Sequence, residues 1–454
     1  MRSRSLLLLN LVCVVGVALW FHQPWSGERK RFFVNESIAA SSEELHRAPE
    51  AAGFRVDVAV EGLDLPWDLA FLSPDEILVT EKAGRMLRID LRTGQRQAVS
   101  GMPEVTVHGQ GGLHAVLLHP KFKDNQLIYL SYADRSPDGG YTTHFARARL
   151  QGNALSDLRL LLQAKAATGR GQHFGGAMAF DDEGYLFLSV GDRGERNDAQ
   201  NLERHNGKIL RLTDDGRVPQ SNPFVLRDKA LPEIWSYGHR NPQGMDFDHA
   251  AGRLWAVEHG PRGGDEVNLI EPGVNYGWPV ITYGKEYVGG SIGQGTARDD
   301  MAQPVHHYVP SIATAGMAYY QSALFPQWRD SVLVTALRGH LNRVQLDGAL
   351  KHTGRLIVGS EQGVRLSVVA RQGVSELNPA DLGHRVQGLL AFKLLVFLIV
   401  SPYIGVTGNN YDRTAVRVYP TDCSIKVAPV LVNRKLILIR SKFNLEREQA
   451  IAIS

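Results

Sequence analysis

Short apolar runs, each about the length of a β-strand, recur along most of the chain and are separated by glycine-containing turns. The clearest pairs of runs lie within 75–94, 184–216, 252–270 and 331–348, and a weaker pair lies within 126–150. Apolar runs of this length, bounded by Asp-Gly or Gly-Arg turns, are typical of strands joined by hairpins. Helical periodicity is scarce in the same region, which argues against alternating helices and strands.

These strand pairs return often enough to predict a repeated architecture. They recur at intervals of ~50 to 80 residues, which indicates supersecondary units arranged around an axis. A β-propeller fits this pattern best, because each of its sheets buries its faces against neighbouring sheets. The long insertions at 191–208 and 259–300 then become loops at one end of the sheets. Loops held by a rigid scaffold are where binding and catalytic residues concentrate.

The first 24 residues form a segment of a different kind. Basic residues in "MRSRS" precede an apolar run from Leu6 to Phe21, which is the pattern of a secretory signal peptide. Because no clear small-residue cleavage site follows, an uncleaved signal anchor is an alternative. We therefore predict a periplasmic or secreted protein. Residues 1–24 are its signal peptide or anchor, residues 50–360 form the propeller, and any membrane contact is through the anchor.

The last part of the chain, residues 361–454, departs from the repeat and is predicted to be a divergent or aberrant segment. It contains an apolar stretch at 389–406, which Lys393, Pro402 and Gly405 interrupt. A membrane span over this stretch is an alternative, but buried strands are the simpler interpretation of so short and interrupted a run. A sequence read out of frame in this segment would give the same picture.

Charge and cysteine content narrow the class of protein. The 454 residues include 50 Lys and Arg and 47 Asp and Glu, for a formal net charge of +3. This near balance, without a long basic block, argues against a nucleic-acid partner. The two cysteines are Cys13 and Cys423. Removal of a signal peptide would leave one of them, so a hydrophobic core and not an intrachain disulfide must hold the fold.

Polar residues gather in glycine-rich loops next to the predicted strands. Gln110 lies in "GQGGL", His173 in "GQHFGG" and Asp192 in "VGDRG", and "YGHRNPQG" contains Arg240 and Asn241. A histidine held by a carboxylate can act as a general base near neutral pH, and an arginine can bind or polarise an oxygen. The turn "EHGPRGGDE" adds backbone carbonyls and acids, the hard oxygen ligands that calcium prefers.

Other chemistries lack their motifs in this sequence. No serine or cysteine stands in a nucleophile-elbow pattern, no dinucleotide-binding glycine fingerprint follows a strand, and the histidines lack zinc-ligand spacing. These absences argue against covalent hydrolysis and against nicotinamide chemistry.

The order of the motifs resembles that of a known family. The chain carries, in sequence, "GQGGL", "HFGG", "VGDRG", "GKILRL", "YGHRNPQGMDF", "EHGPRGGDEVNL", "NYGWP" and "ALRG". This series resembles the soluble quinoprotein glucose/sorbosone dehydrogenases, the aldose sugar dehydrogenases of bacterial periplasms. The resemblance implies a six-bladed β-propeller, all-β, with five blades readable here and a doubtful sixth, that carries pyrroloquinoline quinone (PQQ) and calcium. It also implies oxidation of the anomeric hydroxyl of an aldose sugar to a lactone, with electrons passed to a soluble or respiratory acceptor.

The resemblance also implies roles for individual residues. His173 is similar to the base that takes the proton of the sugar hydroxyl, Asp192 to the residue that orients it, and Arg240 to the group that faces the quinone oxygen. The residues implied to contact the cofactor as well are Gln110, Asn241 and Arg338. The residues implied for calcium binding are Gly260 and Pro261, through their carbonyl groups, and Asp265, Glu266 and Tyr276.

Two departures from the family pattern leave other functions open. Ala177 stands where the family commonly has an arginine, and no Arg-x-Arg-Asp pattern, whose arginines meet the cofactor carboxylates, follows residue 361. A calcium-dependent lactone hydrolase on a six-bladed propeller would use similar acids and a histidine without a quinone. A non-catalytic propeller that binds sugar or protein is the other alternative.

Overall fold

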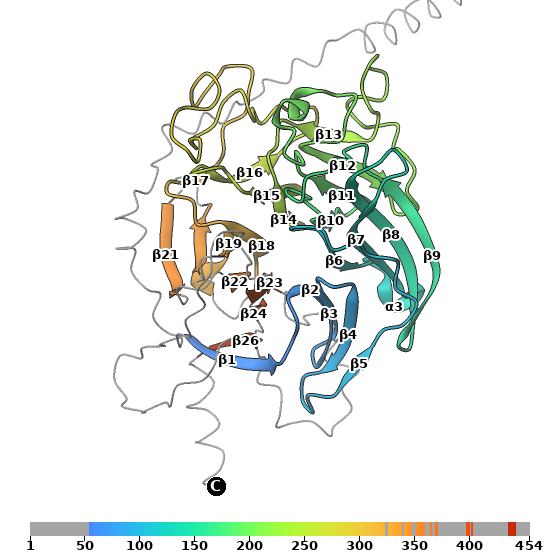
Figure 1. Cartoon of the computed structure of the whole chain (residues 1–454). Coiled ribbons are helices and arrows are strands. Elements are labelled where there is room, and N and C mark those ends of the chain that lie inside the picture. Colours follow the sequence, from blue (N-terminus) through green and yellow to red (C-terminus); the bar gives the residue numbers. More distant parts are fainter. Residues whose placement is uncertain are drawn as a thin grey trace, which may run out of the picture. The chain divides into compact units, whose positions relative to one another are not determined.

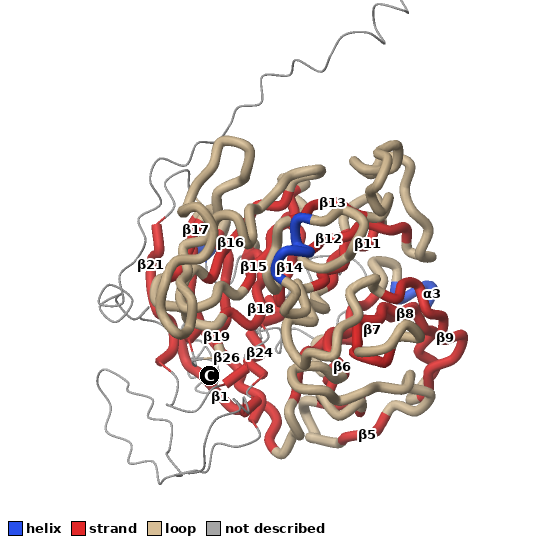
Figure 2. The backbone as a smooth tube through the Cα atoms, turned by 45° about the horizontal axis from the view of Figure 1, so that its top comes forward, coloured by secondary structure: helices blue, strands red, loops and turns tan. Residues whose placement is uncertain are grey.

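The structure, a computed structural model, describes residues 54–322, 326–337, 340–346, 351–358, 364–365, 368–370, 396–399, 401–402 and 435–441. These residues belong to the compact unit of residues 37–454, and the predicted signal segment lies outside them. Their regular secondary structure is almost entirely β-strand (Figure 1, Figure 2). The helical elements within this part of the chain are α3 (Phe122–Asn125) and the short 3-10 helices η1 (Arg196–Gln200) and η2 (Pro326–Trp328).

Five antiparallel sheets of four strands follow one another along the chain, each built from consecutive strands. The first comprises β2 (Pro66–Ser73), β3 (Glu76–Glu81), β4 (Arg85–Asp90) and β5 (Arg96–Ala98). The second comprises β6 (Leu113–Leu118), β7 (Leu127–Arg135), β8 (Tyr141–Gln151) and β9 (Ala154–Gln163). The third comprises β10 (Met178–Phe180), β11 (Tyr185–Val190), β12 (Lys208–Thr213) and β13 (Ile234–Tyr237). The fourth comprises β14 (Pro242–Asp248), β15 (Arg253–Glu258), β16 (Asp265–Ile270) and β17 (His306–Tyr308). The fifth comprises β18 (Thr314–Tyr320), β19 (Ser331–Ala336), β20 (His340–Gln345) and β21 (Lys351–Val358).

The first strands of these sheets line up beside one another around an axis, so the sheets form the blades of a β-propeller (Figure 1). Hydrophobic clusters fill the space between the faces of successive sheets. One joins the first and second sheets through residues such as Leu78 and Leu130, and another joins the third and fourth through Phe187 and Met245. The core therefore lies between blades, as a fold of repeated sheets requires. This arrangement confirms the predicted all-β propeller.

A further four-stranded sheet combines the beginning and the end of the described chain. Its order is β1 (Phe54–Glu61), β26 (Lys435–Ser441), β24 (Val396–Ile399) and β23 (Val368–Ala370). It lies between the fifth and first sheets, because β23 contacts β18 and β24 contacts β2. Part of the apolar stretch at 389–406 is thus a strand, and no described helix is long and apolar enough to cross a membrane. The short strands β22 (Val364–Arg365) and β25 (Ser401–Pro402) pair separately.

Hydroxyl groups on second strands connect the second blade to the third and the third to the fourth. Ser131 on β7 accepts a hydrogen bond from the amide of Ala115, at 3.0 Å, and donates one to the carbonyl oxygen of Gly176 in the next sheet, at 2.6 Å. Ser189 on β11 repeats the pattern with the carbonyl of Pro242. At Ser131 the hydroxyl bonds an amide within a β-bulge, where the register of β6 against β7 shifts, and so replaces a ladder bond that the bulge leaves unmade.

Removal of the Ser131 hydroxyl is expected to destabilise the propeller. In Ser131→Ala the carbonyl of Gly176 loses its buried partner, which we expect to lower the free energy of unfolding by about 1–3 kcal/mol. Urea unfolding of the cofactor-free protein measures the change. Ser100→Ala, which alters an exposed hydroxyl, is the matched control and should change stability by less than about 0.5 kcal/mol. Equal stability of the two variants would contradict this assignment.

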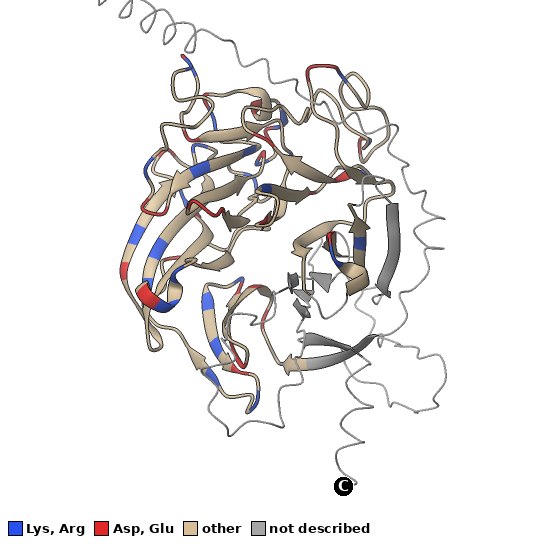
Figure 3. Cartoon of the chain, turned by 180° about the vertical axis from the view of Figure 1, so that it is seen from behind, with Lys and Arg blue, Asp and Glu red and all other residues tan. Residues whose placement is uncertain are grey.

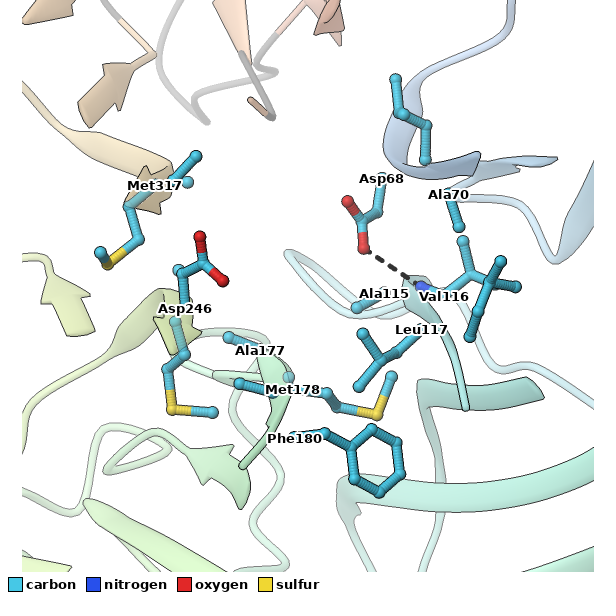
Figure 4. Close-up of a pocket in the computed structure, with 18 of the residues that line it drawn as sticks. Asp68, Ala70, Ala115, Val116, Leu117, Ala177, Met178, Phe180, Asp246 and Met317 are labelled. Carbon is cyan, nitrogen blue, oxygen red and sulfur yellow. Dashed lines mark hydrogen bonds between the residues drawn. The ribbon is translucent and has the colours of Figure 1, made fainter. Parts of the chain in front are cut away.

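The first strands enclose a central cavity of about 420 Å³ (Figure 4). Its lining is mostly apolar and includes two carboxylates, Asp68 and Asp246. Each carboxylate accepts a hydrogen bond from a backbone amide of the next blade, Val116 at 3.1 Å and Tyr319 at 2.8 Å. Burial raises the pKa of Asp246 to about 6. Both acids thus join neighbouring blades. The residues that line the cavity are those that hold the blades together.

Candidate active site

The predicted site residues lie at one end of the sheets. Because adjacent strands are antiparallel, the segment before the first strand of a blade and the segment after its second strand reach the same end. Gln110, His173 and Arg240 precede β6, β10 and β14, while Asp192 and Gly260 follow β11 and β15. The propeller therefore brings together side chains from distant parts of the sequence. None of the charged residues among them lines the central cavity.

A buried histidine–carboxylate pair forms the centre of this cluster. The distance between His173 Nδ1 and Asp192 Oδ1 is 2.6 Å, and their side chains are 12% and 1% exposed. With an ionised carboxylate as acceptor, Nδ1 carries the proton and Nε2 keeps a lone pair. The amide of Gly194 donates to the same carboxylate oxygen at 2.7 Å. The imidazole is thereby fixed in the tautomer that a general base requires.

The backbone at His173 is held in the left-handed region, with φ of +55°. Two amide side chains stabilise this loop: Gln110 Oε1 accepts from the amide of His173 at 2.8 Å, and Asn241 Oδ1 accepts from that of Gly175 at 3.0 Å. A non-glycine residue in this conformation is costly and is often found at functional sites. Gln110 thus positions the histidine through its own amide, and Asn241 does so through the amide of Gly175.

Electrostatics keep the pair in the form His neutral, Asp charged. Burial lowers the pKa of His173 below its usual value, and the positive charge of Arg240 lowers it further, against the opposing hydrogen bond and charge of Asp192. For Asp192, burial acts to raise the pKa, but the hydrogen bond from His173 and nearby positive charge outweigh it, so the pKa is lowered. A neutral imidazole beside a carboxylate is ready to accept a proton.

Arg240 forms hydrogen bonds with the end of β15 and the loop that follows it, through both its main chain and its side chain. Its amide donates to Glu258 Oε2 at 2.6 Å, and its NH1 group donates to the carbonyl oxygens of His259 and Gly260 at 3.1 and 2.8 Å. Glu258 also bonds His239 Nδ1 at 2.9 Å. Arg240 is buried, with 7% of its surface exposed, and its charge acts on the histidine–carboxylate pair.

The glycine-rich turn after β15 is compact and is shaped by Asp265. One carboxylate oxygen of Asp265 accepts from the amide of Gly260 at 2.9 Å, and the other accepts from the amide of Ala313 at 2.6 Å. A side chain at Gly260 would meet the carbonyl oxygens of Gly263 and Gly264 at 2.3 and 2.2 Å. Carbonyl groups are therefore crowded in a small space, and no side chain larger than glycine fits there.

The structure places the other predicted metal residues behind this turn. Glu266 is partly buried next to Glu258, and burial followed by the charge of Glu258 raises its pKa well above the usual value. The hydroxyl of Tyr276 donates to the carbonyl of Leu269 at 2.5 Å and accepts from the amide of Glu271 at 2.9 Å. In the described ranges no three His, Cys, Asp or Glu side chains cluster as a metal site, and Arg338 lies outside those ranges.

Two functional neighbours were missed by sequence reasoning. Trp278 donates its indole N–H to Asp192 Oδ2 at 2.8 Å, and Glu258 anchors Arg240 as described above. The motifs "NYGWP" and "EHGPRGG" contain both residues, so the signal was present. Their partners, however, lie 86 and 18 residues away in the sequence, and such contacts cannot be recognised without the fold.

Fold and site together define a propeller enzyme that presents a histidine–carboxylate pair and an arginine at one end of its sheets. The chain belongs to the glucose/sorbosone dehydrogenase family, whose model matches residues 63–375. The resemblance seen in the sequence is thus confirmed.

Named relatives support this membership. The chain is 42% identical to the aldose sugar dehydrogenase YliI of Escherichia coli (strain K12) over 316 residues, which cover 68% of this chain and 84% of that protein. Its structure is similar to the apo form of the soluble aldose sugar dehydrogenase from Escherichia coli, with a TM-score of 0.71 and 32% identity over 86% of this chain and all of that one. It is also similar to the PQQ-bound aldose sugar dehydrogenase from Streptomyces coelicolor, with a TM-score of 0.62 and 25% identity over 86% and 100% of the two chains.

Proposed function

We propose that this protein is a PQQ-dependent, calcium-dependent aldose sugar dehydrogenase that oxidises the anomeric hydroxyl of an aldose to the lactone. The observation that carries the proposal is the buried His173–Asp192 pair beside Arg240, in a chain of the glucose/sorbosone dehydrogenase family. Electrons then pass to a separate soluble or respiratory acceptor, and the protein works after export to the periplasm or beyond, as its N-terminal sequence suggests.

The residues present fit a flat, anionic quinone and a hard cation. Arg240 supplies positive charge at the site, and its fork geometry suits quinone and carboxylate oxygens. The turn at Gly260, where a Cβ would collide with two carbonyl oxygens, offers the hard oxygen donors that calcium prefers. Gly260 and Pro261 would hold the ion through their carbonyls. The bound quinone and calcium would supply a hydride acceptor and a Lewis acid.

Proton removal is the part of the reaction that the chain itself performs. His173 Nε2, with Nδ1–H committed to Asp192, accepts the proton of the sugar hydroxyl as the C–H bond breaks. Asp192 stabilises the imidazolium that results, because its charge lies 2.6 Å away and is held by Gly194 and Trp278. Arg240 opposes protonation of His173 before the sugar binds, which keeps the base free.

The pH profile should report this arrangement. A base must be neutral to act, and the pKa of His173 is lowered. We therefore expect kcat/KM to stay level as pH falls from 8 and to drop only below the usual histidine pKa of about 6.5. In Asp192→Asn the interactions that raise the pKa of His173 are lost, so the acid limb should move to still lower pH while kcat falls. An acid limb that moves upward in this variant would contradict the assignment.

Reconstitution tests the proposed function directly. Purified protein, incubated with PQQ and calcium chloride, should reduce a redox dye when an aldose is added, and chelation of calcium before loading should prevent it. The absorption spectrum of the quinone during titration measures cofactor binding independently. A well-folded, quinone-loaded protein that oxidises no aldose would refute the proposal. A folded protein that does not bind the quinone but hydrolyses lactones would support the hydrolase alternative.

A further inference from the structure

The carboxylate of Asp192 accepts hydrogen bonds from three donors, of which His173 is only one. Its Oδ1 atom faces His173 and the amide of Gly194, while Oδ2 accepts the indole N–H of Trp278 at 2.8 Å. All three donors bond the same carboxylate, whose side chain is 1% exposed. A carboxylate held from both oxygens cannot rotate away from its histidine without leaving a buried donor unpaired.

Trp278 is itself fixed firmly. Its amide donates to the carbonyl of Gly238 at 2.8 Å, and its carbonyl accepts from Gln200 Nε2 at 2.7 Å. The guanidinium carbons of Arg240 and Arg196 lie 5.5 and 5.8 Å from the centre of the indole ring. These distances suit cation–π contact. The indole is therefore held by main-chain bonds and packed against two arginines.

The loop that follows Trp278 is linked to the same group. Arg196 forms an ion pair with Glu286, with an N–O distance of 2.5 Å. The hydrogen bond from Arg196, and to a smaller extent the charge of Arg240, lower the pKa of Glu286. Trp278 thus joins Asp192, the 3-10 helix that contains Arg196 and the segment around Glu286. It is the one described side chain that hydrogen-bonds Asp192 Oδ2.

We propose that Trp278 is a positioning residue that completes a His173–Asp192–Trp278 hydrogen-bonded chain, acting through Asp192 to set the orientation and basicity of His173. The inference rests on the proposed function for its kinetic consequence. The hydrogen-bonded chain itself is a property of the cofactor-free protein and can be measured there. An N–H donor on the far oxygen draws negative charge away from the histidine, so its loss makes Asp192 a stronger acceptor for His173.

The test is Trp278→Phe, which keeps an aromatic ring beside both arginines and removes the N–H donor. In the cofactor-free protein, NMR of ¹⁵N-labelled histidine should show His173 titrating at higher pH than in the wild type. In the reconstituted enzyme, kcat should fall roughly tenfold, the scale of a change of about 1.4 kcal/mol, with a smaller change in KM, and the acid limb of kcat/KM should move upward. Asp192→Asn moves it the other way. The matched control is Trp255→Phe, which removes the N–H of a buried indole in the core between the fourth and fifth blades and should leave the titration of His173 unchanged.

A measurement on the wild type covers the case in which Trp278→Phe fails to fold. The indole N–H resonance of Trp278 should follow the titration of His173 with the same midpoint, while that of Trp255 should not. A folded Trp278→Phe with an unchanged His173 titration, or an indole resonance of Trp278 that ignores that titration, would overturn the proposal. Absence of dehydrogenase activity in the wild type would instead count against the proposed function, and both NMR results would still decide the role of Trp278.

Discussion

His173→Asn should reduce kcat by about 10²- to 10⁴-fold, the range typical for loss of a general base. Asparagine is the informative replacement because it tolerates the left-handed backbone that this position adopts, with φ of +55°, whereas alanine would add strain to the loss of the base. The fold and quinone binding should persist, since the loop is held through main-chain bonds from Gln110 and Asn241. Dye reduction by the reconstituted variant, with circular dichroism and quinone titration, measures each property separately.

A second histidine–aspartate pair provides the control. His249 Nδ1 lies 2.6 Å from Asp182 Oδ1, the same distance as in the site pair, but both side chains are more than half exposed and lie at the opposite end of the sheets. His249→Asn should therefore leave kcat and KM unchanged. Full activity of His173→Asn with the quinone bound would show that another group removes the proton.

Arg240→Lys is expected to lower kcat by about 10²- to 10³-fold, the effect of removing one preorganised donor at a centre of developing charge. Lysine keeps the charge but loses the planar guanidinium, whose NH1 group donates to both carbonyls of the next loop. The weaker hold on the Gly260 turn should also weaken quinone and calcium binding. Stopped-flow reduction of the loaded quinone separates the chemical step from cofactor affinity.

The neighbouring Arg262 offers a matched comparison, because it lies on the same turn and is exposed. Arg262→Lys should retain wild-type kcat and cofactor affinity. If Arg240→Lys instead behaves like Arg262→Lys at full quinone loading, Arg240 does not act on the reacting atoms.

The sequence predicted the second and third strands of each blade and missed the first and fourth strands. Second and third strands, such as β3 and β4, have a buried apolar centre of a few residues, because neighbouring blades cover the faces of a middle strand. Among the first strands, β10 has three residues and β18 contains an irregularity in its register with β19, and fourth strands such as β5 are exposed. Neither has a period that a sequence window detects.

The candidate site was likewise predictable only where a local sequence motif marks it. His173, Asp192 and Arg240 were predictable because each lies in a glycine-rich motif with a reactive side chain. Asp265 bonds the amides of Gly260 and Ala313, and Trp278 bonds Asp192. The roles of Asp265 and Trp278 therefore depend on contacts between blades. Such contacts are set by the ring of sheets and leave no local pattern. The calcium roles of Asp265, Glu266 and Tyr276 and the cofactor role of Arg338 stay predictions.

The pairing of β1 with β26 has a consequence for biogenesis. Phe54 pairs with Ser441, so the ring is fastened by the first and last described strands. A nascent polypeptide cannot form this pairing until β26 has left the ribosome, and such distant pairing is slow. Until then the free rims of the first and fifth sheets offer unpaired backbone to other molecules. Chaperones that shield sheet rims should therefore matter more for the yield of this protein than for proteins whose strands pair only with close neighbours in sequence.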